Sequence, residues 1–266
     1  MRNNKPIQVF EHKQLQIGDQ GFMRSHWEAL GWYNEKHGES FFTLTPKGVK
    51  FNQFVGVIQV GNICIEILPK ISQIVNQGDK EKWQKVLIDM LRECRWMQVY
   101  AHEKASLRFK PNSILEAYLE LFLYECEQLL RHGLVKRYRL VVNNCNALKG
   151  KLLFQKQVQV NSVHKERFYT RHQIFDRENV FNQILLKALK LVPILSQSPY
   201  LKDKVYNLLL SFPELADIVV TQETFTKLVF DRKTSGYKEA IEIAAMLLLN
   251  YRADISTGQN HVLAIL

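Results

Sequence analysis

The sequence predicts an α+β fold, in which a small β-rich N-terminal module is followed by a mainly helical domain with a short basic β insertion. Short runs of alternating apolar and polar residues dominate residues 6–75, and this period of two is typical of strands. Apolar residues then recur at helical spacing as far as Tyr251, and a basic, strand-like stretch interrupts them at about 134–160. We therefore expect domains at residues 1–75 and 76–266.

The clearest element of the N-terminal module is a hairpin over residues 55–68. Its two alternating halves flank Gly61-Asn62, a two-residue turn signal, because glycine supplies the positive φ that such a turn requires. Pro69 ends the second strand, since proline has no N–H to donate to a ladder. Clustered aromatic rings can bind nucleobases, but here they are expected to pack against the sheet: Trp27, Trp32, Tyr33, Phe41 and Phe42.

A polar stretch at residues 72–79 separates this module from the helical residues and is the best candidate linker. Exposed polar linkers open more readily than packed elements, so we expect proteases to cut there. Two helices should follow, one over residues 83–94 and one that begins at Ser113. Ser113 and Glu116 form a capping-box pattern, and Gly133 suits the left-handed cap at the end of the second helix.

The C-terminal half predicts further helices. Asp176 is placed to cap a helix with apolar spacing from Val180 to Val192, and Pro193 ends or kinks it. The residues after 261 form an apolar run without a cap or a stop signal. The remaining helical patterns cover residues 200–210, 221–229 and 237–251.

The most basic part of the chain lies between these two groups of helices. A strand-like segment at 134–142 leads to an asparagine-rich turn at 143–146, a short apolar strand at 152–154 and a charged connection at 163–172. Such cations form either a surface for phosphates or an acidic partner, or a solvated charged face; the sequence leaves both interpretations open. The basic residues are Lys136, Arg137, Arg139, Lys149, Lys151, Lys156, Lys165, Arg167 and Arg171.

Composition narrows the classes of function. The formal net charge of +10 favours an anionic partner, with nucleic acid as the first candidate. No apolar run approaches the roughly 18 residues of a membrane span, and no GxxxxGK, HExxH or GxSxG motif occurs. The four cysteines form no CxxC pair, which argues against a zinc ribbon and is typical of free thiols in a reducing cytoplasm: Cys64, Cys94, Cys126 and Cys145. We expect a cytoplasmic protein without membrane contact, bound metal or nucleotide.

One pair of segments superficially mimics the pattern of a magnesium-dependent nuclease. Pro213-Glu214 is followed by Asp231 and Lys233. Such a site needs two carboxylates on adjacent strands to hold magnesium, and a lysine to position or activate water. The surrounding pattern is helical, so we assign no catalytic residue and expect no cleavage of DNA by this chain.

Three stretches, in order across most of the chain, resemble the McrC family, the nuclease component of modification-dependent McrBC-type restriction systems. Residues 55–58 and 65–71 are also similar to an N-terminal module that many members carry. The three stretches are Asn146 to Leu152 with the basic-Gly-basic entry Lys149-Gly150-Lys151, Phe175-Asp176 with Asn179 and Asn182, and Tyr237-Lys238 opening a helix to Asn250 with Gly258-Gln259-Asn260 after it.

The resemblance implies a bipartite protein. In this family the N-terminal part docks on a hexameric AAA+ GTPase, the McrB component, and stimulates its GTP hydrolysis. A C-terminal PD-(D/E)xK domain cuts DNA with magnesium. In family order that domain would begin just after Leu266, so this chain is expected to be the part without it. The resemblance then assigns GTP to the partner, magnesium to the nuclease domain and, as a candidate partner, DNA carrying 5-methylcytosine or another modification.

The basic insertion is the expected site of partner or DNA binding. Its candidate binding residues are Lys149, Lys151, Arg167 and Arg171, and its expected structural motif consists of Gly150, Asp176, Asn179 and Asn182. Gly150 would supply backbone geometry at a strand entry. Two alternatives remain: a stand-alone DNA-binding module, and a divergent metal-dependent endonuclease that uses Asp231 and Lys233.

Overall fold

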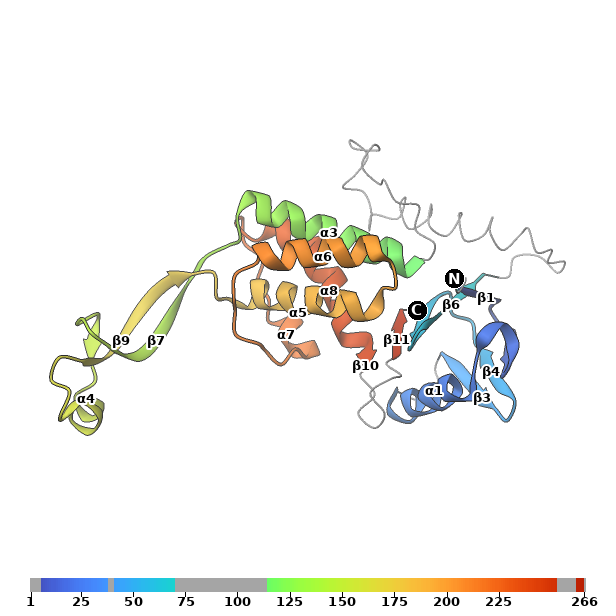
Figure 1. Ribbon diagram of the computed structural model, residues 1–266, viewed down its shortest axis with the longest axis horizontal. Helices are drawn as coiled ribbons and strands as arrows, with labels where there is room; N and C mark the ends of the chain where they lie inside the picture. The colour runs from blue at the N-terminus through green and yellow to red at the C-terminus, as the bar shows by residue number, and fades with distance from the viewer. Residues whose placement is uncertain (1–5, 38–40, 70–113, 253–261, 266) are drawn as a thin grey trace.

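The computed structural model describes residues 6–37, 41–69, 114–252 and 262–265. Figure 1 shows three parts in a row, namely a β-rich part at one end, a bundle of helices in the middle and a slender arm at the other end. This mixed architecture confirms the predicted α+β fold class. Within the described ranges, no helix is both long enough and apolar enough to cross a membrane.

The largest sheet combines N-terminal strands with the last strands of the chain. Its order is β1-β6-β5-β11-β10; β1 lies parallel to β6, and the other neighbours are antiparallel. In the predicted hairpin, now confirmed, Val60 pairs with Ile63 and Gly61 has a φ of +53°. The strands are β1 Ile7–Phe10, β5 Gly56–Val60, β6 Ile63–Leu68, β10 Tyr251–Arg252 and β11 Val262–Ile265.

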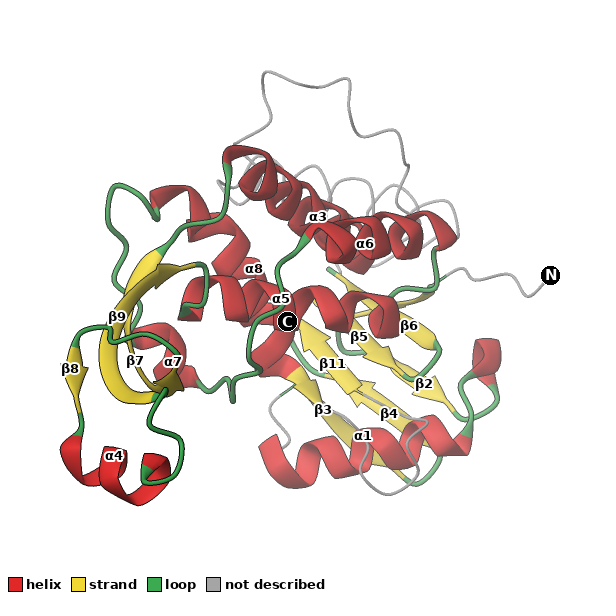
Figure 2. Cartoon of the chain, turned by 60° about the vertical axis from the view of Figure 1, so that its left-hand side comes forward, coloured by secondary structure: helices red, strands yellow, loops and turns green. Residues whose placement is uncertain are grey.

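A three-stranded sheet and a helix share a core with one face of this large sheet. The order of the small sheet is β2-β4-β3, and Figure 2 shows α1 running beside β3 and β4. Leu30, Phe42, Ile58 and Val60 belong to the common core. The elements are β2 Gln14–Gln16, the 3-10 turn η1 Asp19–Gly21, α1 Arg24–His37, β3 Phe42–Thr45 and β4 Gly48–Phe51.

Helix α1 corrects the expectation that residues 6–75 are mostly stranded. Trp27, Trp32 and Tyr33 lie on this helix, and Tyr33 is buried while Trp32 is exposed. Aromatic residues are only moderate helix formers, and the polar residues among them weaken the helical period. Tertiary packing of Leu30 and Tyr33 stabilises the helix instead.

Four helices form the main core. Helix α5 packs against α6 and α8, and α3 packs against the same two helices. The predictions for these helices are confirmed to within a few residues; Gly133, with a φ of +90°, follows α3, and Pro193 lies in the last turn of α5. The helices are α3 Ile114–His132, α5 Val180–Leu195, α6 Pro199–Ser211 and α8 Lys238–Asn250.

Two short elements complete the helical part. Helix α7, Gln222–Thr226, is shorter than the predicted 221–229, because its capping box starts at Thr221 and the turn ends at Lys227. The 3-10 turn η3, Ser235–Tyr237, leads into α8.

The large sheet belongs to both cores. On β5, Val57 joins the helical core while Ile58 joins the N-terminal core, and on β11 Leu263 and Val262 divide in the same way. The apolar run predicted after residue 261 is therefore a strand whose partner lies about 200 residues away, since Val262 pairs with Val60. The expected linker, the expected helix at 83–94, Cys94 and Ser113 all lie outside the described residues, so the domain boundary stays a prediction.

A buried carboxylate joins the sheet to the start of α3. Glu66 on β6 is fully buried; it accepts hydrogen bonds from the Ile114 backbone N–H at 2.8 Å and from Gln8 Nε2 at 3.1 Å. The first amides of a helix have no partner within the helix. The helix start is therefore fixed by a strand residue 48 positions away in sequence.

Candidate functional site

The basic insertion forms an arm that projects from the helical bundle. Its sheet has the order β7-β9-β8, and β7 pairs with β9 along its whole length, from Arg137 opposite Asp176 to Cys145 opposite Phe168. Figure 1 shows this ribbon leading away from α3 and α5, with α4 at its far end. The elements are β7 Arg137–Cys145, β8 Lys151–Leu152, α4 Phe154–Asn161 and β9 Phe168–Asp176.

The structure corrects three local expectations within the arm. Asn143 and Asn144 continue strand β7, because they pair with Thr170 and Tyr169 on β9, and do not form a turn. Phe154 begins helix α4 and does not extend the short strand. The charged connection at 163–172 contains the first half of β9, because polar residues are compatible with a two-stranded ribbon that is open to solvent.

One face of the ribbon is apolar and exposed. Tyr138 on β7 and Phe175 on β9 are direct cross-strand neighbours with ring centroids 4.8 Å apart, and Tyr138 is 72% exposed. Leu140 and Val142 continue the same face toward the tip, and both are exposed. Exposed apolar residues that adjoin one another are typical of interaction surfaces.

At the tip of the arm, polar side chains are buried and apolar side chains are exposed, which is the reverse of the usual arrangement. Helix α4 is fastened by amides, since Asn161 is buried and donates to Asn144 Oδ1 at 2.9 Å, while Gln157 Oε1 accepts from the Tyr169 N–H at 2.6 Å. Apolar side chains point outward instead, and Phe154 is 74% exposed. The other exposed apolar residues of the tip are Leu148, Val158, Val160 and Val163.

The four cations predicted to bind a partner or DNA lie around this tip. Lys151 on β8 pairs with Arg171 on β9, and both side chains are exposed. Like charges directly opposite each other on a sheet repel, so an anionic group would stabilise the pair. Lys149 and Arg167 are exposed in the flanking loops, and Arg167 lies 3.9 Å from Glu166.

Gly150 allows the loop to approach β9 closely. Its φ is +65°, and a Cβ atom there would lie 2.5 Å from the Arg171 carbonyl oxygen and 2.8 Å from His172 Cβ. A side chain at this position is therefore excluded both by backbone conformation and by space. The glycine places Lys149 and Lys151 at the strand entry.

Ion pairs brace the base of the arm. Arg139 contacts Asp176 at 2.9 Å and Glu178 at 3.0 Å, and Arg137 contacts Asp231 at 3.1 Å. The hydrogen bond from Arg139 holds the pKa of the Asp176 carboxyl below its ordinary value, and the Glu178 backbone N–H acts in the same direction. Arg137 thus ties β7 to the body, whereas the Arg139–Asp176 pair joins the two strands of the ribbon to each other.

The cap of helix α5 corrects another expectation. The N-cap is Asn179, whose side chain accepts from the Asn182 N–H at 3.3 Å. Asp176 lies too far upstream to cap the helix; its Oδ1 accepts from the Glu178 N–H at 3.0 Å in the preceding turn. Asn182 is fully buried and donates to the carbonyl oxygens of Val135 at 3.0 Å and Arg177 at 2.7 Å.

The nuclease-like residues form a turn. Asp231 Oδ1 accepts from the backbone N–H groups of Lys233 and Thr234, both at 2.9 Å. The hydrogen bond with the Thr234 side chain is the main reason that the pKa of Asp231 is lowered. Among the described residues, no three His, Cys, Asp or Glu side chains gather to hold a metal ion. The Asp231 carboxylate is thus engaged by hydrogen bonds within its own turn.

The fold thus consists of a sheet shared between two cores, a body of four helices and a projecting ribbon. The model of one family, described as a McrBC 5-methylcytosine restriction system component, matches residues 49–266. The chain belongs to this family, and its resemblance to the McrC component is confirmed. A search of curated proteins gave no match.

Two solved structures share the fold. The cryo-EM structure of the Thermococcus gammatolerans McrBC complex has a TM-score of 0.67 and 17% identity; the match covers 92% of this chain and 80% of that chain. A refined half-complex from a tetradecameric assembly of Thermococcus gammatolerans McrB AAA+ hexamers with bound McrC has a TM-score of 0.66 and 17% identity. That second match covers 92% of this chain and 64% of the other.

Sequence reasoning found the cations of the arm but missed its apolar surface. The alternation of Tyr138, Leu140 and Val142 predicts a strand with one apolar face. It does not show that this face lacks a covering layer, because the covering layer of a strand comes from elsewhere in the chain. The hydrogen bond between Asn144 on β7 and Asn161 on α4 could not be predicted either, since it joins residues that are 17 positions apart.

Proposed function

We propose that this chain is the McrC-like subunit of a modification-dependent restriction system, and that it docks on a hexameric AAA+ GTPase through its arm and stimulates GTP hydrolysis. Family membership supports the restriction system. The shared fold with a protein from an assembly of McrB AAA+ hexamers with bound McrC supports the type of partner. The arm is the part of this chain best suited to reach that partner.

The exposed apolar face of the arm is the observation that carries the proposal. Tyr138, Leu140 and Phe175 are exposed on the ribbon, while side-chain amides hold the tip together. Their exposure is unfavourable in water, and burial of apolar area stabilises an interface by about 25 cal/mol per Å². A narrow projection of this kind fits between subunits or into a pore better than it fits a flat surface.

The cations at the tip add a preference for an acidic surface. Subunits of AAA+ GTPases commonly present acidic and nucleotide-lined surfaces toward a central pore. Lys151 and Arg171 repel each other in the free arm, so an acidic surface would relieve that repulsion as well as attract the tip. The ion pair between Arg137 at the base of the arm and Asp231 on the body would help to keep the arm oriented during docking.

Charge reversal at the tip tests this proposal. Lys149→Glu combined with Lys151→Glu should weaken binding to the cognate GTPase and reduce stimulated GTP turnover without lowering the melting temperature. Charge reversal at a close interfacial contact costs up to several kcal/mol, whereas a rim charge mainly changes the association rate and its salt dependence. The matched control is Lys190→Glu with Lys238→Glu, because both of these lysines are exposed on the helical body. Unchanged stimulation would remove the tip cations from the mechanism, and a large melting shift would make them structural.

DNA binding is the second candidate function, because the net charge is +10 and cations gather at the tip. Binding to nucleic acid through phosphates weakens steeply as salt increases. Tight, salt-sensitive binding of DNA by the isolated chain, abolished by the same double variant, would favour this candidate over GTPase docking.

The division into domains at about residue 75 remains our proposal as well. Limited proteolysis should cut first within residues 73–78. The two fragments should stay associated after the cut, because β11 from the C-terminal end pairs with β5 in the N-terminal sheet. A primary cut elsewhere in the chain would place the boundary at a different position.

A further inference from the structure

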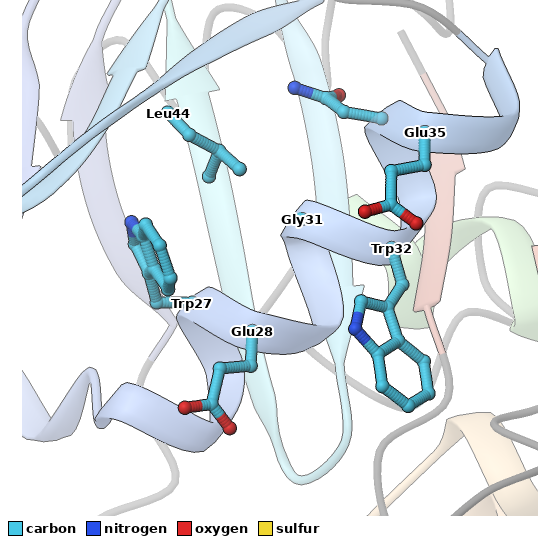
Figure 3. Close-up of a pocket in the computed structure, with 7 residues that line it drawn as sticks. Trp27, Glu28, Gly31, Trp32, Glu35 and Leu44 are labelled. Carbon is cyan, nitrogen blue, oxygen red and sulfur yellow. The ribbon is translucent and has the colours of Figure 1, made fainter.

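A pocket of about 360 Å³ lies beside helix α1, far along the chain from the arm. Figure 3 shows Trp27, Gly31, Trp32 and Glu35 along the helix and Leu44 on the neighbouring strand. Two indole rings thus contribute to one small hollow. Trp32 is 50% exposed, so a large apolar ring borders the pocket without a covering layer in the described residues.

One side of the pocket is preformed. The Trp27 indole N–H donates to the carbonyl oxygens of Thr45 at 3.1 Å and Gly48 at 3.0 Å, which fixes the ring against the small sheet. A Cβ atom on Gly31 would lie 3.3 Å from Leu44 Cδ1, so the glycine lets helix and strand approach closely. The Trp27 ring and the contact between helix and strand therefore need no rearrangement when a ligand enters.

One polar side chain that lines the pocket is almost fully buried. Asn34 lines the pocket, is only 7% exposed, and donates from Nδ2 to the Phe42 carbonyl oxygen at 3.0 Å. This bond fixes the orientation of the amide. Its Oδ1 is buried and accepts no hydrogen bond in the part of the chain that is described. The Asn34 amide is therefore held in place beside the pocket, and its buried Oδ1 is not exposed to a ligand.

The charge of the pocket is opposite to that of the chain. Glu28 and Glu35 line the pocket and are exposed. Glu28 lies 3.2 Å from Arg24, whereas Glu35 forms no ion pair with the described residues. The pocket therefore combines two carboxylates with an exposed indole ring in a chain with a net charge of +10.

We propose that this pocket binds an arginine side chain of a partner polypeptide. A guanidinium group is planar, stacks on an indole face and carries several N–H donors. It can stack on Trp32 and donate to the Glu35 carboxylate. A nucleic-acid ligand would bring phosphates toward two carboxylates, which disfavours it. This surface is independent of the arm and of the function proposed for it.

The test follows the tryptophan indole N–H signals of the full chain by NMR. The probe is the peptide acetyl-Gly-Arg-Gly-amide, and its comparison peptide carries citrulline, the neutral isostere, in place of arginine. The arginine peptide should shift the Trp27 and Trp32 signals saturably, and the citrulline peptide should bind more weakly. Trp32→Ala and Glu35→Gln should each weaken binding about twofold to fivefold, the effect of an exposed cation–π contact or a comparable charge contact. Assignment of the signals uses Trp27→Phe and Trp32→Phe.

Two control variants keep the result specific. Met23→Ala removes an exposed apolar side chain just before α1, and Glu223→Gln removes an exposed carboxylate on α7; neither should change the affinity. Equal response to both peptides, or no saturable shift at millimolar peptide, would overturn the proposal. Shifts caused by a single-stranded oligonucleotide and not by peptide would assign the pocket to nucleobases instead. Self-association that Trp32→Ala abolishes would place the ligand on a second copy of this chain, which also overturns the assignment.

Discussion

The Tyr237 hydroxyl donates a hydrogen bond to Asn182 Oδ1 at 3.0 Å and accepts one from the Val135 backbone N–H at 2.8 Å. Tyr237 and Asn182 are 55 positions apart in the sequence and lie at the starts of helices α8 and α5, respectively. Val135 leads into the first strand of the arm, and Asn182 also donates to its carbonyl oxygen. One tyrosine and one asparagine therefore tie the arm to two helices of the body.

Removal of the Tyr237 hydroxyl should loosen this connection. Tyr237→Phe leaves the Val135 N–H and Asn182 Oδ1 without their partner, so the free energy of unfolding should fall by about 1–3 kcal/mol. Urea denaturation measures the change. The control is Tyr206→Phe, since Tyr206 is exposed on α6, and it should have almost no effect. An equal effect of the two variants would show that the buried network adds no stability.

The apolar residues of the tip should matter for binding and not for folding. Phe154→Ser with Val158→Ser should reduce stimulation of the partner GTPase, because both side chains are exposed and lie one helical turn apart on α4. The melting temperature should stay within about 2 °C, as expected for surface changes that remove no packed contact.

Leu210→Ser is the control for this variant, because Leu210 is even more exposed but lies on α6 of the body. GTP turnover and a melting curve are measured for each protein. A tip variant that melts early without loss of stimulation would mean that the two side chains serve the fold.

Gly150→Ala should distort the tip. The new methyl group would meet the Arg171 carbonyl oxygen, and alanine would have to adopt a positive φ. A non-glycine residue in this conformation costs about 1–2 kcal/mol, and the clash adds to this. Hydrogen exchange at the amides of β8 and β9 should therefore become faster. Gly236→Ala is the control, since a Cβ atom there would meet nothing within 4 Å; equal protection in both variants would refute a special role for Gly150.

The ion pair at the base of the arm predicts a pH dependence. Because the pKa of Asp176 is lowered in the folded chain, folding favours the ionised carboxylate. The resulting stabilisation is fully present above the unfolded pKa of about 4 and is lost as the pH falls through the lower folded pKa. Asp176→Asn should therefore decrease the free energy of unfolding at neutral pH and change it little at about pH 2.

Urea denaturation at the two pH values checks this expectation, with Asp203→Asn on the exposed side of α6 as the control. A difference between Asp176→Asn and the parent chain that persists undiminished at low pH would show that side-chain packing, and not charge, is what Asp176 contributes. The exposed position of the pair keeps the expected effect small.

The sequence alone determined the local elements of this protein. Alternation around Gly61-Asn62 fixed the β5–β6 hairpin, and apolar spacing together with Gly133 fixed the end of α3 and the courses of α5, α6 and α8. These signals suffice because turn chemistry and amphipathic periodicity act between residues close in the chain. The family resemblance came from the same source, because it rests on short motifs.

Only the tertiary structure decided what those elements do together. It placed the run after residue 261 in the N-terminal sheet, replaced Asp176 by Asn179 as the cap of α5, and left Tyr138 and Phe154 on the surface of an arm. Each of these outcomes depends on contacts between distant residues, such as Val60 with Val262 and Asn182 with Tyr237. The sequence does not distinguish an apolar residue that faces a core from one that faces a partner, because burial depends on which other parts of the structure cover the side chain.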